Sequence, residues 1–232
     1  MNKCLVMFSG GQDSATCLFW ALQNYDYVET VKFDYNQRHK VELDVRQEFL
    51  DFLKNDFKDL HAKLGNDHAI NATNLSELGE TAMTAEIEIE FSKSGLPTTF
   101  VPGRNLYFFT MTSAIGYRRD IYNLVGGMCE TDYSGYPDCR RTTMDNLEKT
   151  LSLGMDKEFK IVTPLMWIDK ANTWKMAQEI GDEKLVEGIK KYTHSCYKGD
   201  RSKFHEWGYG CGECPACELR SNGYKLWKEQ QS

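Results

Sequence analysis

The chain carries the stretch Phe8-Ser9-Gly10-Gly11-Gln12-Asp13-Ser14 at the end of an apolar run that begins at Cys4. That run predicts a buried strand of a parallel sheet, and apolar residues between 15 and 24 recur at helical spacing. Both glycines of the turn are expected to take backbone conformations closed to other residues. The free N–H groups at the helix start and both serine hydroxyls would then point at one place, which predicts a phosphate or pyrophosphate cradle. The alternative, a glycine-rich turn that binds nothing, is disfavoured by this strand-turn-helix context.

The loop differs from two better-known phosphate-binding motifs. The chain has no Gly-Lys dipeptide, which excludes a Walker loop, and it has no G-x-G-x-x-G. Its pattern, Ser-Gly-Gly-x-Asp-Ser after a first strand, resembles that of pyrophosphate-loop enzymes. Those enzymes split ATP between its α and β phosphates, adenylate a substrate oxygen and release pyrophosphate into this loop. The resemblance implies an ATP-binding stretch that consists of Phe8, Ser9, Gly10, Gly11, Gln12, Asp13, Ser14, Ala15, Thr16, Cys17 and Leu18.

The composition narrows the class of protein. A chain of 232 residues, 41% hydrophobic and 27% charged, is long enough for one sizeable α/β domain with a small addition. The first strand begins almost at the N-terminus, and no apolar run approaches the roughly 20 residues that cross a bilayer, so we expect neither a signal peptide nor a membrane span. The eight cysteines are then expected to be reduced thiols or metal ligands. These features together predict a cytoplasmic protein.

The charge of the chain bears on its partners. A formal net charge of −6 argues against a large nucleic-acid footprint. An acidic chain fits a small-molecule substrate better, and we expect no direct contact with nucleic acid.

Apolar strands and helical patterns alternate along the chain. We expect strands at 28–33, 68–70, 121–128 and 161–165, and helices at 40–55, 101–117, 142–153 and 169–180. This alternation predicts an α/β fold with a doubly wound, mostly parallel, Rossmann-like sheet. Residues 84–94 are expected to form an exposed strand or a lid. One boundary, near Lys190, divides a nucleotide-binding domain (1–189) from a C-terminal segment (190–232).

The C-terminal segment contains a metal-binding pattern. Three cysteines at intervals of three residues follow a fourth one 15 residues upstream, and these four are Cys196, Cys211, Cys214 and Cys217. The spacing predicts a closed tetrahedral zinc site, because glycines and charged residues flank the thiols where a packed core would have apolar ones. An iron–sulfur cluster uses the same ligand type and is the main alternative. Eight basic and five acidic residues follow position 189. This excess of positive charge is too small for a strong phosphate-binding patch. A zinc site that stabilises the C-terminal segment is therefore favoured over a zinc ribbon that binds nucleic acid.

Two further stretches are rich in polar groups. Arg104 lies at an expected helix N-terminus, where its guanidinium can meet a phosphate or a carboxylate. The stretch 132–140 follows an expected strand and offers carboxylates for a guanine-like base and aromatic rings for stacking. An ordinary hydrogen-bonded turn with solvated charges would contain the same residue types. The chemistry of these residues alone therefore does not decide between a substrate-binding role and a structural turn.

The motifs occur together in an order that resembles the 7-cyano-7-deazaguanine synthase family of queuosine biosynthesis. The set comprises the loop at 9–14, residues 35–39, Val101-Pro102-Gly103-Arg104-Asn105, residues 132–140 and the four cysteines. Two features differ from the usual pattern of that family. Asn36 stands at a position where glycine is commoner, and the interval from Cys196 to Cys211 is longer than in many members. The resemblance implies 7-carboxy-7-deazaguanine, ammonia and ATP as substrates, one structural Zn²⁺ per chain, Mg²⁺ with ATP, and a homodimer.

The resemblance also implies roles for individual residues. Asp13 would hold Mg²⁺, Arg104 would neutralise phosphate charge, and His39 would transfer protons, although a structural role for this histidine is equally compatible. The substrate-binding set would be Arg104, Asn105, Asp132, Tyr133, Ser134, Asp138 and Arg140. Two alternatives stay open at this point: a tRNA thiolase or lysidine-type synthetase with the same loop, and a zinc-ribbon protein that binds nucleic acid.

Overall fold

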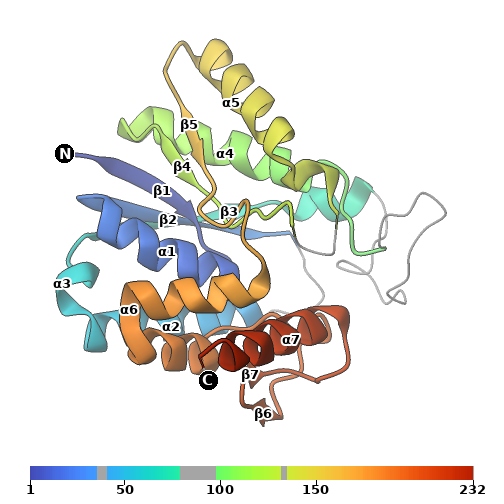
Figure 1. Cartoon of the computed structure of the whole chain (residues 1–232). Helices are drawn as coiled ribbons and strands as arrows, with labels where there is room; N and C mark the ends of the chain where they lie inside the picture. Colours follow the sequence, from blue (N-terminus) through green and yellow to red (C-terminus); the bar gives the residue numbers. More distant parts are fainter. Residues whose placement is uncertain (36–40, 79–97, 132–134, 232) are drawn as a thin grey trace.

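The computed structural model describes residues 1–35, 41–78, 98–131 and 135–231. A five-stranded sheet with the order β3-β2-β1-β4-β5 lies at its centre, and every pairing between neighbours is parallel (Figure 1). The strands are β1 (Lys3–Met7), β2 (Tyr27–Asp34), β3 (Leu64–Asn71), β4 (Asn123–Val125) and β5 (Lys160–Val162). The parallel sheet confirms the predicted fold class.

Helices cover both faces of this sheet. One face carries α1 (Gln12–Asn24), α2 (Val41–Asp56), α3 (Lys58–His61), α6 (Lys170–Tyr192) and α7 (Pro215–Glu229), while the other carries α4 (Arg104–Arg119) and α5 (Arg141–Met155) (Figure 1). Two separate apolar clusters correspond to these two interfaces. The described remainder includes the short helices η1 (Thr73–Leu78) and η2 (Pro137–Cys139) and a hairpin of β6 (Phe204–His205) and β7 (Gly208–Tyr209).

The strand order creates a crevice beside β1. The chain winds from β1 to β2 and β3, then crosses back to β4 on the other side of β1. In open sheets, ligands bind at the carboxyl ends of the strands at such a reversal. Gly127, just beyond β4, allows a close approach here, because a Cβ on it would lie 3.3 Å from the Asp13 backbone carbon. The fold therefore places the glycine loop after β1 at the switch point.

Several elements differ in extent from the prediction. β4 is shorter than the expected 121–128, because the chain leaves the strand at Val125 and continues through two glycines. The helix expected at 169–180 begins with Asp169, whose side chain accepts from the Asn172 N–H, and it is interrupted at Gly181–Asp182 before it resumes to Tyr192. The expected strand or lid at 84–94 lies outside the described residues.

The C-terminal segment packs on the sheet domain through aromatic rings. Trp174 of α6 lies 5.2 Å from the ring of Tyr224 and 6.1 Å from that of Trp227, both on α7. These rings belong to the same apolar cluster as the core of α1. The division at 189/190 stays a prediction. Among the described helices, none combines the length and the apolar character that a membrane crossing needs.

Candidate functional site

The glycine loop forms the expected corner between β1 and α1, with one correction. Gly10 has a φ of +99°, which L-residues avoid, but Gly11 is extended (φ −79°, ψ 164°), so the expected special conformation is wrong for Gly11. Gly11 is the N-cap of α1 and has no side chain that could cap the helix, while Ser195 Oγ accepts from the Gln12 N–H at 3.4 Å. The positive end of the α1 dipole therefore lies at the loop, as an anion site requires.

The two serines of the loop hold its shape. Their hydroxyls lie 3.1 Å apart, Ser9 Oγ accepts from the Gly11 N–H at 3.3 Å, and Ser14 Oγ donates to the Gly11 carbonyl at 3.0 Å. Behind the loop, the buried Arg46 donates from Nε to the Phe8 carbonyl at 2.7 Å. The corner is thus fixed by hydrogen bonds from inside and from α2.

A cavity of about 340 Å³ opens at this corner. Its polar end is lined by Ser9, Gly11, Gln12, Asp13, Ser14, Lys170, His194, Ser195 and Arg220. Its aromatic end is lined by Phe33, Tyr35, Arg104, Asn105, Phe108, Tyr136, Cys139 and Tyr197. Ala15, Thr16, Cys17 and Leu18 of the implied ATP stretch are buried in α1 and do not line it.

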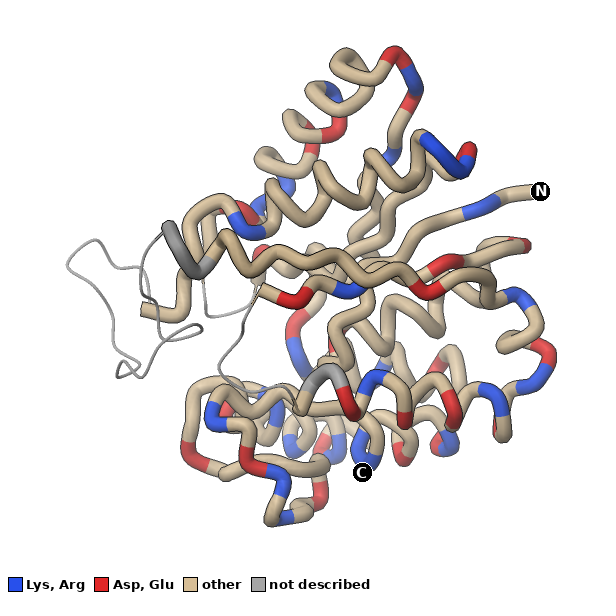
Figure 2. The backbone as a smooth tube through the Cα atoms, turned by 180° about the vertical axis from the view of Figure 1, so that it is seen from behind, with Lys and Arg blue, Asp and Glu red and all other residues tan. Residues whose placement is uncertain are grey.

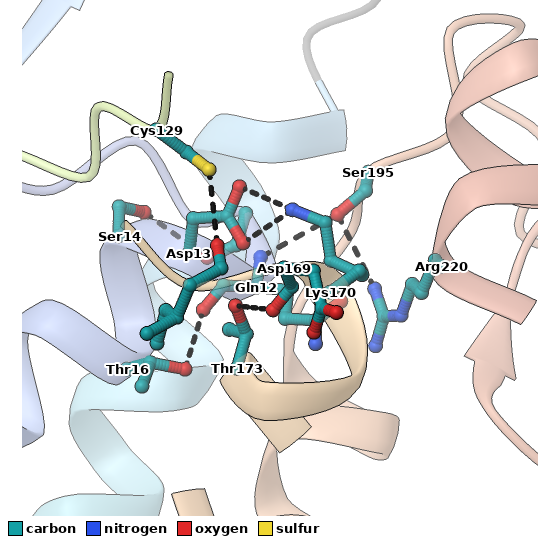
Figure 3. A network of polar contacts seen from close by, with 12 residues as sticks. Gln12, Asp13, Ser14, Thr16, Cys129, Asp169, Lys170, Thr173, Ser195 and Arg220 are labelled. Atoms are coloured by element: carbon teal, nitrogen blue, oxygen red, sulfur yellow. Dashed lines mark hydrogen bonds and ion pairs between the residues drawn. The ribbon is translucent and has the colours of Figure 1, made fainter. Parts of the chain in front are cut away.

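An ion pair stands at the polar end (Figure 3). Lys170, the first residue of α6, places Nζ 2.8 Å from each carboxylate oxygen of Asp13. The Lys170 side chain is only 9% exposed, so its charge is compensated locally. The sequence interpretation missed this lysine, although its position after the last strand, at the carboxyl edge of the sheet, is the signal that would have indicated it.

Arg220 of α7 also reaches the polar end. It is buried, and it donates to the carbonyls of Trp207 and Ile189 at 3.0 Å each. Burial lowers the pKa of Arg220 to about 10, although the charge of Asp13 acts in the opposite direction. The guanidinium is therefore still cationic at neutral pH. Gln12 adds a buried amide Nε2 that has no hydrogen-bond partner in the described part of the chain.

The aromatic end surrounds Arg104. Phe33 and Phe108 stack with ring centroids 4.0 Å apart, and Tyr35 lies 5.7 Å from Phe108. Burial alone would lower the pKa of Arg104, but the fields of Tyr35, Tyr136, Asp138 and Cys139 outweigh it and raise that pKa above its ordinary value. This end can stack a flat ring and present a permanent cation to an anion.

The remaining predicted substrate residues fall into three groups. Asn105 lines the cavity, and its backbone N–H donates to Asp138 Oδ2 at 3.0 Å. Asp138 and Arg140 do not line it, and Asp138 Oδ1 is buried with no partner in the ranges that the structure describes. The other predicted members, Asp132, Tyr133 and Ser134, lie outside the described residues, as does His39, the candidate for proton transfer.

The four cysteines of the C-terminal segment converge. The sulfurs of Cys196, Cys211, Cys214 and Cys217 lie within 4.8 Å of one another, with Cys211–Cys217 at 3.8 Å and Cys196–Cys214 at 3.9 Å. Four thiolates about 2.3 Å from one ion at tetrahedral angles would lie roughly 3.8 Å apart. The close sulfur of Cys196 raises the pKa of Cys214 above its ordinary value. The cluster can hold a metal ion.

Comparisons with known proteins agree with this geometry. The chain is 57% identical to the 7-cyano-7-deazaguanine synthase of Paraburkholderia phymatum over 97% of this chain and 93% of that protein, and 57% identical to the Burkholderia mallei protein of the same name over 100% and 95%. A crystal structure of a 4-thiouridine synthetase–RNA complex with bound ATP shares the fold, with a TM-score of 0.52 and 16% identity over 99% of this chain and 53% of that one. The model of the family described as "Queuosine biosynthesis protein QueC" matches residues 3–228. The chain therefore belongs to the QueC family.

Proposed function

We propose that the chain converts 7-carboxy-7-deazaguanine and ammonia to 7-cyano-7-deazaguanine, with two ATP cleaved to AMP and pyrophosphate per product. The observation that supports this most is the 57% identity to curated synthases over nearly the whole length of both chains. The fold alone would fit any pyrophosphate-loop enzyme. Acidic and basic residues are interspersed along the described helices (Figure 2), which suits a small substrate better than RNA.

The reaction needs two activations of oxygen. A carboxylate oxygen attacks the α-phosphorus of the first ATP and releases pyrophosphate, and ammonia then displaces AMP to give the amide. The amide oxygen attacks the α-phosphorus of a second ATP and releases a second pyrophosphate, and loss of AMP and of both protons on the nitrogen leaves the nitrile. The protein supplies no nucleophile in this scheme, so positioning and charge stabilisation carry the rate.

The polar end would hold the triphosphate. The first N–H groups of α1 and the serines of the loop would bind the departing pyrophosphate. Lys170 and Arg220 would neutralise its charge, a role that their lining of the same cavity supports. Asp13 is our proposed Mg²⁺ ligand, since a carboxylate that accepts from Lys170 still has oxygen lone pairs for a hard cation.

The aromatic end would hold the deazaguanine. Phe33 and Phe108 offer ring faces, and Arg104 would face the carboxylate or a phosphate. The loop 132–140 would read the base: Tyr136 and Cys139 line the cavity, and Asp138 fixes Asn105. His39 remains our candidate for proton transfer.

The cysteine cluster would hold one Zn²⁺ with a structural role. The sulfur separations suit a single tetrahedral ion better than an iron–sulfur cluster, in which the thiolates bind different irons. Elemental analysis of the purified chain should give one zinc per chain, and Cys217→Ser should lose it while Cys129→Ser keeps it. A brown protein that contains iron and sulfide would contradict this assignment.

The oligomeric state and the cellular compartment follow from the same family resemblance and from the cysteines. We propose a homodimer; α4 presents the exposed apolar side chains Leu106 and Tyr117, and light scattering of the purified chain tests it. None of the eight cysteines, all of which lie in the described ranges, forms a disulfide, which fits the reducing cytoplasm.

Mass spectrometry of the reaction products tests the proposed function. The chain is incubated with 7-carboxy-7-deazaguanine, ammonium and MgATP, and the expected products are the nitrile, AMP and pyrophosphate. ATP/pyrophosphate exchange that depends on the carboxylated base isolates the first activation. ADP in place of AMP, or exchange that is unchanged in Asp13→Ala and Ser9→Ala, would contradict the role of the loop.

A further inference from the structure

The cysteine cluster and the glycine loop meet at Ser195. Ser195 directly precedes Cys196, and its Oγ accepts from the backbone N–H of Gln12 in the first turn of α1 at 3.4 Å. Its neighbour His194 donates its backbone N–H to the Gly10 carbonyl at 3.0 Å. The chain that leads into the metal cluster is therefore bonded to the loop on both sides of Gly11.

Helix α7 holds the same hydroxyl from the opposite side. Cys214 is the N-cap of α7 and Cys217 lies in its first turn. One turn later, Arg220 donates from Nη1 to Ser195 Oγ at 3.4 Å (Figure 3). Arg220 is itself fixed on the carbonyl of Trp207, which lies between Cys196 and Cys211. The four cysteines thus lie at the ends of the segments that carry Ser195, Trp207 and Arg220.

The O–H group of Ser195 can still donate a hydrogen bond. An alcohol oxygen has two lone pairs and one O–H. Gln12 and Arg220 occupy the two acceptor positions, and no acceptor for the O–H is found among residues 1–35, 41–78, 98–131 and 135–231. Ser195 lines the polar end of the cavity. The arrangement leaves one oriented donor at the wall of the predicted pyrophosphate site.

We propose that Ser195 is a further residue that positions the triphosphate, and that it couples metal binding at the cysteine cluster to nucleotide binding at the loop. This inference rests on the proposed function only in that the cavity must bind ATP. Without the metal, the start of α7 and the chain at 194–196 lose a common anchor, so Ser195 and Arg220 are no longer held beside Gln12. Coupling between two sites is reciprocal, so bound nucleotide must strengthen metal binding by the same factor.

Two binding measurements on the full-length, metal-loaded chain test the coupling. Metal affinity is measured by competition with a chromophoric chelator, with and without α,β-methylene-ATP, and nucleotide affinity is measured by calorimetry before and after metal removal. We expect each ligand to tighten the other about tenfold, within the range common for coupled sites. In Ser195→Ala the factor should fall below about twofold, while metal affinity without nucleotide is unchanged.

Matched variants separate this role from general damage to the fold. Ser202→Ala changes the same residue type in the same segment, where the exposed hydroxyl bonds only Asp200 among the described residues, and it should keep the full coupling. Ser195→Thr keeps a hydroxyl and should restore coupling lost in Ser195→Ala. Full coupling in Ser195→Ala, or none in the parent chain, would overturn the inference. Neither measurement uses the deazaguanine, so a failure to make the nitrile would contradict the proposed function alone.

Discussion

Lys170 Nζ lies 2.8 Å from both carboxylate oxygens of Asp13, and this symmetric contact joins the start of α6 to the start of α1. The two residues are 157 positions apart in the sequence, and they meet at the switch point beside β1. The pair places a cation next to the N–H groups of α1, where the triphosphate is proposed to bind. Asp13 is 31% exposed on the cavity side, so the pair is accessible to a ligand.

Replacing Lys170 by Met should therefore reduce catalysis much more than stability. We expect kcat/KM for AMP formation to fall about 10²–10³-fold, as when one preorganised charge-stabilising donor is removed. The free energy of unfolding should fall by only about 1 kcal/mol, because Asp13 can be partly solvated. Lys175→Met on the same helix, whose lysine is 55% exposed, is the control and should leave AMP formation unchanged. Equal rates in both variants would exclude a role for Lys170.

The two loop glycines should respond differently to alanine. Gly10 has a φ of +99°, so Gly10→Ala should destabilise the fold by about 1–3 kcal/mol. Gly11 is extended, and a Cβ there would have its nearest contacts at 3.5 Å or more, so Gly11→Ala should leave the melting temperature within a few degrees of the parent. The added methyl group would still stand at the cavity wall between the loop and His194. Gly11→Ala should thus raise KM for ATP about tenfold, and a normal KM would show that the nucleotide does not approach Gly11.

Protonation of Glu29 should contribute to the loss of folding stability at low pH. This carboxylate is fully buried on β2 and accepts from Arg119, His68 and Tyr27. Burial by itself raises the pKa of Glu29, but these hydrogen bonds outweigh it and lower that pKa below its ordinary value. A group whose pKa is depressed in the folded state stabilises the fold fully above its unfolded pKa, near 4.3, and this contribution is lost as pH falls through the folded value.

Glu29→Gln should accordingly lower stability at pH 7 by about 2 kcal/mol and flatten the pH dependence below about pH 4.5. Urea unfolding of both chains between pH 3 and pH 7 measures this difference. Glu158→Gln, at a carboxylate whose side chain is 83% exposed, is the control and should follow the parent curve. A Glu29→Gln chain with the same acid transition as the parent would contradict the linkage.

The local parts of the site could be predicted from the sequence, and the parts that only the fold brings together could not. The corner at 8–14 is one continuous stretch, so its pattern contains the strand, the turn and the helix start. The cysteine cluster was predictable because three of its members are close in sequence. Lys170, Ser195 and Arg220 stand in no recognisable motif, and each reaches the cavity from an element more than 150 residues after the loop. The prediction for Gly11 failed because a Gly-Gly pair does not show which glycine has the positive φ.

The two arginines of the predicted substrate set provide the sharpest test of the aromatic end. Arg104 lines the cavity at the start of α4, whereas Arg140 precedes α5 and does not line it. The surroundings of Arg104 raise its pKa above the ordinary value, so an anionic group of the substrate would meet a cation there. Arg104→Met should reduce kcat/KM for the carboxylated base at least about 100-fold, since a charge-assisted contact that is lost in the transition state costs several kcal/mol. Arg140→Met should stay within about threefold of the parent in the same AMP-release assay. The reverse order of effects would move the base-binding site away from the aromatic end and toward the N-terminus of α5.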